Sequence, residues 1–286
     1  MILTADAVSK RKEFYPLQIG FLGGDRRMEI AADILKKHGH TVIKAPEAPP
    51  PDESFYDSLD LLVLPYPVTR DGSLVALSSV PIDSIRLSPK TALFGGRLPS
   101  AIRKYTCFDA EDDEEYLYGN AYLTAAAGVA TALRAGERAF FRVHAAVIGF
   151  GRIGKQTACM LRALGANVTV YVRRKEAAKE ATLCGFTAML LSETKHLPEA
   201  LVFGTAPAPA ENLATLTVTQ NALIYDLGGG LPDTLLSDTG ECVKVLPLRS
   251  APGVFAPMAA GELYGGAILK AIDALTHAQK PPQERN

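Results

Sequence analysis

The sequence predicts an α/β protein with two doubly wound parallel sheets. Two observations predict this fold: short apolar runs alternate with helical segments over residues 17–94, and the same alternation restarts after residue 145. Parallel strands need a crossover connection, which is usually a helix, so this pattern is typical of parallel sheets covered by helices. The length of 286 residues suggests two domains rather than one.

The first half is expected to form the smaller sheet. The helix after its first strand has apolar residues at helical spacing and ends at Gly39. The proline-rich residues 45–52 are expected to be a surface connection, because proline cannot donate to a strand ladder. The strands are expected at residues 17–22, 41–44, 59–64 and 91–94.

An alanine-rich segment from Tyr122, preceded by the acidic residues 111–115, is expected to be a long helix joining the domains. A last amphipathic segment, residues 259–278, is expected to pack back on the first domain and close a cleft. Six further strands, which would complete a dinucleotide-binding sheet, are expected at residues 145–148, 168–172, 187–190, 201–204, 222–227 and 243–246. The expected domains are residues 1–120, with about 255–280 packing back, and residues 121–254.

Composition excludes several classes of protein. Lys+Arg is 30 and Asp+Glu is 31, and this balance disfavours non-specific nucleic-acid binding. With 48% hydrophobic residues the chain is not expected to be disordered, and no apolar run reaches the roughly 18 residues of a membrane span. The first residues do not have the pattern of a signal peptide, so a cytoplasmic protein is expected. The four cysteines form no CxxC pair, so no metal site is predicted.

The strongest motif is VIGFGRIG at residues 147–154, which follows an apolar strand and opens a helix. Gly149 permits the tight turn, Gly151 lets backbone N–H groups approach a pyrophosphate, and Gly154 lets helix and strand pack closely. The helix N-terminus adds partial positive charge. We therefore expect two Rossmann-like domains, with the dinucleotide bound along Phe150, Arg152 and Ile153 of the same loop.

The end of the next strand selects the nucleotide. NAD-binding enzymes usually place Asp or Glu there to accept hydrogen bonds from the ribose, but this position falls near Val172. Arg173 and Arg174 follow at once and offer guanidinium groups to a 2′-phosphate. NADP is therefore expected as the cofactor and NAD as the second choice. Further cofactor contacts are expected at the ends of later strands, from Thr205, Ala206, Pro207 and Asp226.

Two kinds of catalysis are disfavoured. D-2-hydroxy acid dehydrogenases share the two-domain plan and use a histidine near the C-terminus, whereas residues 246–257 contain none. No Gly-x-Ser-x-Gly pattern supports a hydrolase.

Over nearly its whole length, the chain resembles the dehydrogenase-like subunit of dipicolinate synthase, an enzyme of endospore-forming bacteria. The resemblance is carried by IGFLGGDRR (19–27), NAYLT (120–124), VIGFGRIGKQT (147–157), LGANV (164–168) and APGVFAP (251–257). The opening GGD with its arginine and the late APGVFAP turn are the more specific motifs. Two positions depart from the family pattern: alanines, Ala126 among them, replace a Glu expected after Thr124, and Met258 replaces a Lys.

The resemblance implies an NADP-linked oxidoreductase that oxidises dihydrodipicolinate, or hydroxytetrahydrodipicolinate, to dipicolinate in the mother cell during sporulation. It also implies, as partner, the other subunit of dipicolinate synthase, which is flavoprotein-like, and a homo-oligomer is possible. A dicarboxylate substrate needs cationic partners, and Arg27 at a helix N-terminus is the first candidate, ahead of Arg26, Arg70 and Arg97. Asp25, Asn120 and Thr124 are expected to orient the ring and pass a proton. The alternative is a nucleotide-binding chain without catalysis that positions or regulates the flavoprotein-like subunit.

Overall fold

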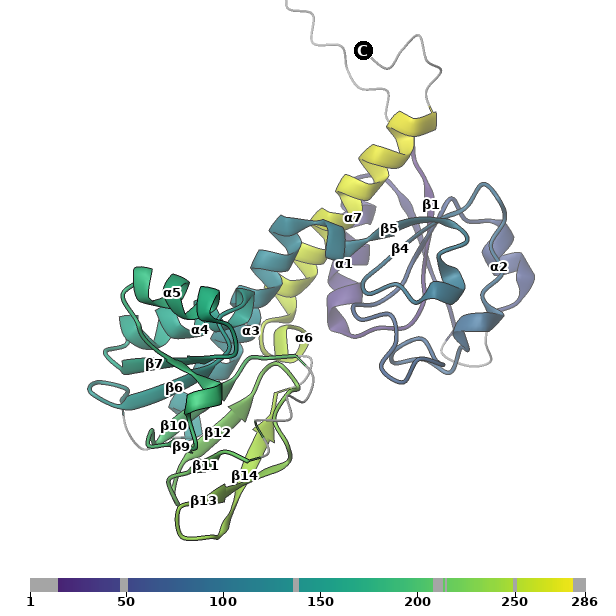
Figure 1. The fold of residues 1–286 in the computed structure, drawn as a ribbon. Helices are drawn as coiled ribbons and strands as arrows, with labels where there is room; N and C mark the ends of the chain where they lie inside the picture. Colours follow the sequence, from purple (N-terminus) through teal and green to yellow (C-terminus); the bar gives the residue numbers. More distant parts are fainter. Residues whose placement is uncertain are drawn as a thin grey trace, which may run out of the picture. The chain divides into compact units, whose positions relative to one another are not determined.

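The structure, a computed structural model, describes residues 15–46, 51–135, 139–207, 213, 215–248 and 251–279. Residues 47–50 of the expected surface connection, and the chain start before residue 15, lie outside this range. The chain forms two compact units (Figure 1). Unit 1 comprises Met1–Gly24, Ala32–Asp109 and Ala271–Asn286, and unit 2 comprises Asp25–Ala31 and Ala110–Lys270.

Unit 1 contains a five-stranded sheet, all parallel, with the strand order β2-β1-β3-β4-β5. This is the flavodoxin-like order, in which ligands bind at the carboxyl ends of the strands. The four expected strands are confirmed to within two residues. The strands are β1 (Gln18–Phe21), β2 (Thr41–Lys44), β3 (Leu61–Val63), β4 (Ala92–Gly95) and β5 (Thr106–Asp109), and the helices are α1 (Arg26–Lys37) and α2 (Glu53–Asp57).

The centre of this sheet is buried on both faces. Every residue of β3 and β4 is buried, as expected for strands covered by helices and loops on both sides. Strand β5 was not expected from the sequence, because only its last residue, Asp109, is fully buried and the run is short and polar at both ends. Its position at the sheet edge explains the weak apolar pattern.

Unit 2 contains a nine-stranded sheet. Its six long-range parallel strands follow the order β8-β7-β6-β10-β12-β14, which is the doubly wound order of dinucleotide-binding sheets. All six match the expected strands. They are β6 (His144–Ile148), β7 (Asn167–Val172), β8 (Thr187–Leu190), β10 (Leu201–Gly204), β12 (Leu223–Asp226) and β14 (Cys242–Pro247), with helices α4 (Arg152–Ala163) and α5 (Lys175–Leu183).

Three short strands extend this sheet beyond β14. Strand β13 (Thr234–Ser237) pairs antiparallel with β14, and β11 (Thr217–Val218) and β9 (His196–Leu197) follow in parallel. The sequence analysis missed all three: β9 and β11 have two residues each and carry no periodicity, and β13 has only four. The sheet is therefore larger than the expected one and is not parallel throughout.

Helix α3 (Glu114–Ala135) begins eight residues before the expected Tyr122. The reason is a side-chain cap: the Asp113 carboxylate accepts the backbone N–H groups of Glu115 at 3.0 Å and Tyr116 at 3.1 Å. Acidic residues in the first turn also favour a helix N-terminus. The end of the acidic stretch thus caps and begins the helix.

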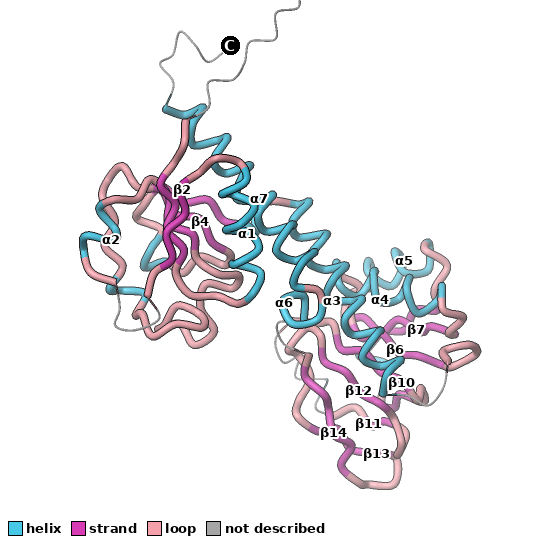
Figure 2. The backbone as a smooth tube through the Cα atoms, turned by 180° about the vertical axis from the view of Figure 1, so that it is seen from behind, coloured by secondary structure: helices cyan, strands magenta, loops and turns pink. Residues whose placement is uncertain are grey.

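The chain ends with α6 (Ala251–Phe255) and the long helix α7 (Pro257–Gln279) (Figure 2). Helix α7 packs against α1 through Gly261, whose position leaves no room for a side chain: a Cβ there would lie 2.5 Å from Cβ of Ile30. From Ala271 onwards the helix belongs to unit 1, which confirms that the chain returns to the first unit. Within the described residues, no helix is long and apolar enough to cross a membrane.

The two glycines at positions 261 and 266 of α7 give a test of this packing. Gly261→Ala should destabilise the protein by about 1–3 kcal/mol, because the added methyl group meets Ile30 and the Arg27 carbonyl. Gly266→Ala should stabilise it by about 0.5–1 kcal/mol, because nothing lies within 4 Å and alanine is the better helix former. Urea unfolding of both variants checks the pair, and equal effects would contradict the close contact.

Candidate functional site

The glycine loop after β6 has a distinct physical constraint at each glycine. Gly149 has φ of +100°, a conformation that disfavours any side chain. A Cβ on Gly154 would lie 2.3 Å from the Gly149 carbonyl oxygen, so the helix can approach the strand this closely only without a side chain. These two constraints are the tight turn and the helix–strand approach that the motif predicts.

Gly151 is different, because it is exposed and nothing lies within 4 Å of where its Cβ would be. It forms the N-cap of α4, and no side chain caps this helix end. The first N–H groups of a helix have no partner within the helix, and together with the helix dipole they favour an anion. The open space over Gly151 is therefore where a pyrophosphate would meet the backbone.

Thr205 ties the glycine loop to the neighbouring strand β10. Its buried hydroxyl donates to the Ile148 carbonyl oxygen at 2.9 Å, and Gly149 has no room for a side chain against the same hydroxyl. Ala206 is half-buried, with its carbonyl oxygen 2.4 Å from a Cβ built on Gly228, and Pro207 is exposed. Thr205 thus shapes the loop, and the expected cofactor contacts of Thr205, Ala206 and Pro207 stay a prediction.

Asp226 was expected to contact the cofactor, but the structure gives its carboxylate another task. The side chain is buried and accepts backbone N–H groups of Gly228 at 3.2 Å, Gly229 at 2.9 Å and Leu231 at 3.3 Å. These bonds hold the glycine-rich turn after β12 against the ends of β10 and β12. Asp226 is therefore a residue that shapes the rim of the site.

The other side chains of the glycine loop are engaged by the protein. Phe150 is buried edge-on against Phe186 at 5.8 Å, and Ile153 packs against the same apolar core. The exposed Arg152 forms an ion pair with Glu114 of α3 at 2.7 Å. The loop consequently offers a ligand its backbone rather than these side chains.

The end of β7 matches the expected selectivity position. Val172 is buried with 3% of its surface exposed, so it offers no hydrogen bond. Arg173 and Arg174 are exposed, and Arg174 is the N-cap residue of α5. Neither side chain forms a hydrogen bond or ion pair with any part of the chain that the structure describes. Two guanidinium groups therefore follow the end of β7, and their recognition of a ribose 2′ substituent stays a prediction.

Asp25 and Arg27 form an ion pair in which Arg27 is buried and Asp25 is partly buried. Arg27 Nε donates to Asp25 Oδ1 at 2.8 Å and Nη2 donates to Oδ2 at 2.8 Å, which is a two-pronged geometry. Burial lowers the pKa of Arg27, but the hydrogen bond and charge of Asp25 outweigh it, so the pKa lies above the usual value. The guanidinium was expected to hold a substrate carboxylate, and the structure shows it holding a carboxylate of its own chain.

The late APGVFAP turn lies directly on this pair. A Cβ on Gly253 of α6 would be 2.4 Å from Asp25 Oδ2 and 2.7 Å from Arg27 Nε. The two motifs, far apart in the sequence, thus meet within unit 2, and only glycine allows the contact. This approach explains why a glycine stands in the middle of a short helix.

Asn120 and Thr124 are linked through the backbone of α3. The Thr124 hydroxyl donates to the Asn120 carbonyl oxygen at 2.7 Å, so its proton is used within the helix and its oxygen remains an acceptor. Thr124 is buried and the Asn120 side chain is half-buried. The expected assignment of proton transfer to these residues stays a prediction.

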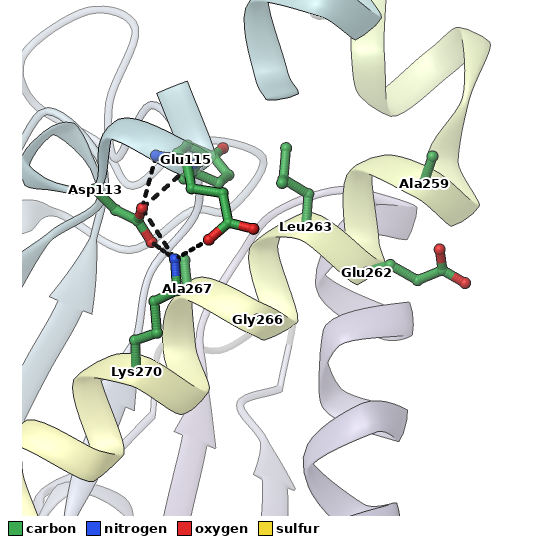
Figure 3. Close-up of a pocket in the computed structure, with 9 residues that line it drawn as sticks. Asp113, Glu115, Ala259, Glu262, Leu263, Gly266, Ala267 and Lys270 are labelled. Atoms are coloured by element: carbon green, nitrogen blue, oxygen red, sulfur yellow. Dashed lines mark hydrogen bonds and ion pairs between the residues drawn. The ribbon is translucent and has the colours of Figure 1, made fainter. Parts of the chain in front are cut away.

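A pocket of about 350 Å³ lies between α3 and α7 in unit 2, and the sequence did not point to it (Figure 3). At its edge Lys270 Nζ contacts Asp113 Oδ2 at 2.9 Å and Glu115 Oε2 at 2.7 Å. Burial raises the pKa of Asp113, but hydrogen bonds from Lys270 and from the helix backbone outweigh it and lower the pKa. The one sequence feature that could have indicated this pocket is Lys270, a single lysine in the largely apolar α7 segment.

The two sheets and the glycine loop together define a Rossmann-like dehydrogenase fold. Residues 130–206 match the family described as D-isomer specific 2-hydroxyacid dehydrogenase, NAD binding domain. This segment contains β6, α4, β7 and β10, so unit 2 carries an NAD-binding domain of this type. No curated protein sequence matches the chain.

Solved structures resemble the chain over most of its length. Dipicolinate synthase from Bacillus subtilis matches with a TM-score of 0.70 and 21% identity, covering 93% of this chain and 99% of that one. Dipicolinate synthase from Bacillus halodurans matches with a TM-score of 0.68 and 18% identity, covering 93% and 98%. A transhydrogenase from Sinorhizobium meliloti matches with a TM-score of 0.57 and 15% identity, covering 90% and 92%. At these identities the likeness establishes the fold.

The open position of Gly151 leads to a direct test of the cofactor site. Gly151→Ala should change the free energy of unfolding by no more than about 1 kcal/mol, because the methyl group meets no protein atom. The same methyl group should weaken dinucleotide binding about tenfold or more, because it keeps the pyrophosphate from the backbone N–H groups. Calorimetric titration with NADP and NAD measures the loss, and unchanged affinity for both would contradict this placement.

Proposed function

We propose that this protein is an NADP-linked dehydrogenase that oxidises dihydrodipicolinate, or a hydroxytetrahydrodipicolinate precursor, to dipicolinate. The observation that carries the dehydrogenase part is the glycine loop, whose three glycines combine a left-handed turn, an open approach to α4 and a close helix–strand contact. The substrate part is supported by the motifs shared with the dehydrogenase-like subunit of dipicolinate synthase and by the fold likeness to two structures of that enzyme.

The reaction balances without another co-reactant. Dihydrodipicolinate loses a hydride from a ring carbon and a proton from the ring, and NADP, when bound, accepts the hydride to give NADPH. The hydroxylated precursor would first lose water. Because the product ring is aromatic, the oxidation is strongly favourable, and orientation of the substrate supplies much of the catalysis. A strong general base is then unnecessary, which is consistent with the missing histidine in residues 246–257.

Asp25 and Arg27 enter this proposal as positioning residues rather than as a free anchor. Their ion pair supports α6 through Gly253. Asn120 and Thr124 are proposed to orient the ring and pass the proton, with the Thr124 oxygen as acceptor. The protein is further proposed to work with the flavoprotein-like subunit of dipicolinate synthase. This takes place in the cytoplasm of the mother cell during sporulation. Assembly of the chain into a homo-oligomer is part of the same proposal.

The first experiment is turnover by the purified chain with enzymatically generated dihydrodipicolinate and NADP. We expect nicotinamide reduction and dipicolinate formation in equal amounts, both followed in the same sample. Turnover only after the flavoprotein-like subunit is added would favour the alternative in which this chain binds nucleotide and completes the active site of a complex. Absence of turnover in both conditions would refute the proposed reaction.

The preference for NADP is tested by changing Arg173 and Arg174 together to alanine. We expect the Kd for NADP to rise about tenfold or more and the Kd for NAD to change less than about threefold, because only NADP carries the 2′-phosphate. Both residues are exposed and stability should be unchanged. Equal weakening of both cofactors would rule out recognition of the 2′-phosphate.

A further inference from the structure

Three loops at the carboxyl ends of β1, β3 and β4 are joined in unit 1 by a chain of backbone hydrogen bonds. Gly24 N donates to Ala76 O at 3.0 Å, Ala76 N donates to Val68 O at 2.7 Å, and Val68 N donates to Gly96 O at 2.8 Å. Val68 is fully buried and Ala76 nearly so. In a sheet of this strand order, the β1/β3 position is where the order reverses and where ligands bind. The rim of this sheet is therefore a rigid scaffold at the place where a ligand is expected.

Arg97 occupies an unfavourable backbone conformation on this rim. Its φ is +57°, in the left-handed region, which costs a residue with a Cβ roughly 1–2 kcal/mol. The conformation is held by the buried Asp109, whose carboxylate accepts the N–H groups of Arg97 at 3.0 Å and Leu98 at 3.1 Å. Arg103 Nη2 also donates to this carboxylate at 2.8 Å. The surrounding structure thus fixes the direction in which the exposed Arg97 leaves the chain.

Two glycines and a tyrosine complete this arrangement. A Cβ on Gly96 would overlap the ring of Tyr66, and one on Gly95 would lie 2.7 Å from Val68 Cγ2. The Tyr66 ring therefore packs directly against the β4 loop. The Arg97 guanidinium lies over the same ring, 5.7 Å from its centroid. An arginine stacked on an aromatic ring keeps its planar fork in one orientation, which suits two-pronged binding of a carboxylate.

Two other residues with a side chain have positive φ in the described part of the chain, and they show what is particular to Arg97. Leu77 (φ +58°) lies in a loop and carries no charge. Arg142 (φ +62°) also stacks on a ring, with its guanidinium 5.1 Å from the Phe141 centroid, but it precedes β6 at the amino-terminal edge of the other sheet. Among these three residues, Arg97 alone combines positive φ, a charged side chain and a position at the carboxyl edge of a parallel sheet.

We propose that Arg97 binds a carboxylate of the dicarboxylate substrate, on a rim of unit 1 built by Tyr66, Gly95, Gly96 and Asp109. This inference rests on the proposed function for the substrate class. It moves the carboxylate contact from Arg27, whose guanidinium holds Asp25, to an exposed arginine that the fold orients at a cost in backbone energy. Strained backbone conformations of this kind cluster at binding and active sites.

Calorimetric titration with pyridine-2,6-dicarboxylate in the presence of NADP tests this role. Arg97→Ala should weaken binding of the dicarboxylate about tenfold or more. Arg97→Gly should weaken it equally without lowering the melting temperature, because glycine adopts positive φ freely. Arg142→Ala and Arg142→Gly are the matched controls, since they remove an arginine of the same conformation and stacking, and they should leave the dicarboxylate affinity within about twofold. The affinity for NADP should be the same in all five proteins.

The outcomes separate this inference from the proposed reaction. Wild-type affinity of Arg97→Gly for the dicarboxylate would overturn the role of Arg97, even if the chain turns over. Failure of the wild-type chain to bind the dicarboxylate would overturn it as well. Loss of dicarboxylate binding confined to the Arg97 variants, in a chain that shows no turnover with NADP, would support the binding site and refute the dehydrogenase reaction.

Discussion

The contact on which the nucleotide half of the molecule depends is the approach of α4 to the end of β6. Gly154 lies so close to the Gly149 carbonyl oxygen that no side chain fits, and the Thr205 hydroxyl joins the same turn to β10. This contact lies where the strand order reverses, between β6 and β10. The uncapped helix end, the open space over Gly151 and the glycine turn held by Asp226 all follow from it. The site is thus a surface of backbone groups held by side chains beneath it.

Arg27 and Arg97 lie in different electrostatic environments. Asp25 and Arg27 neutralise each other in a buried pair, and Gly253 packs on them without a side chain. Removing one partner of such a pair leaves a buried charge, at a cost of several kcal/mol, so an arginine of this kind is poorly suited to releasing and binding a substrate. Arg97, by contrast, is exposed, and the Asp109 carboxylate fixes its backbone. This contrast is the physical reason for assigning the substrate carboxylate to Arg97.

Much of the fold could be predicted, because long apolar runs separated by helical segments have few other solutions. All ten expected strands are present in the structure. The six in unit 2 have the order of a dinucleotide-binding sheet, which is the sheet that the glycine motif predicts. Strands β9, β11 and β13 and the edge strand β5 were missed, since two residues or half-exposed runs leave no pattern. The start of α3 was misplaced because the capping role of Asp113 could not be distinguished from an acidic linker.

For the candidate site, two features could be predicted: the spacing of the three glycines and the absence of an acidic residue after Val172. Both are properties of contiguous residues, so they do not depend on how the chain folds. The state of the charged groups could not be predicted in the same way, although their partners are close in sequence. Asp25 lies two residues from Arg27, and Gly229 lies three residues from Asp226. That Gly253 packs directly on the Asp25–Arg27 pair depends on segments that the fold brings together. The sequence therefore determined the sheets and the phosphate-binding turn. The tertiary structure alone decided which ionic side chains are engaged, because electrostatic pairing depends on distance in space and not along the chain.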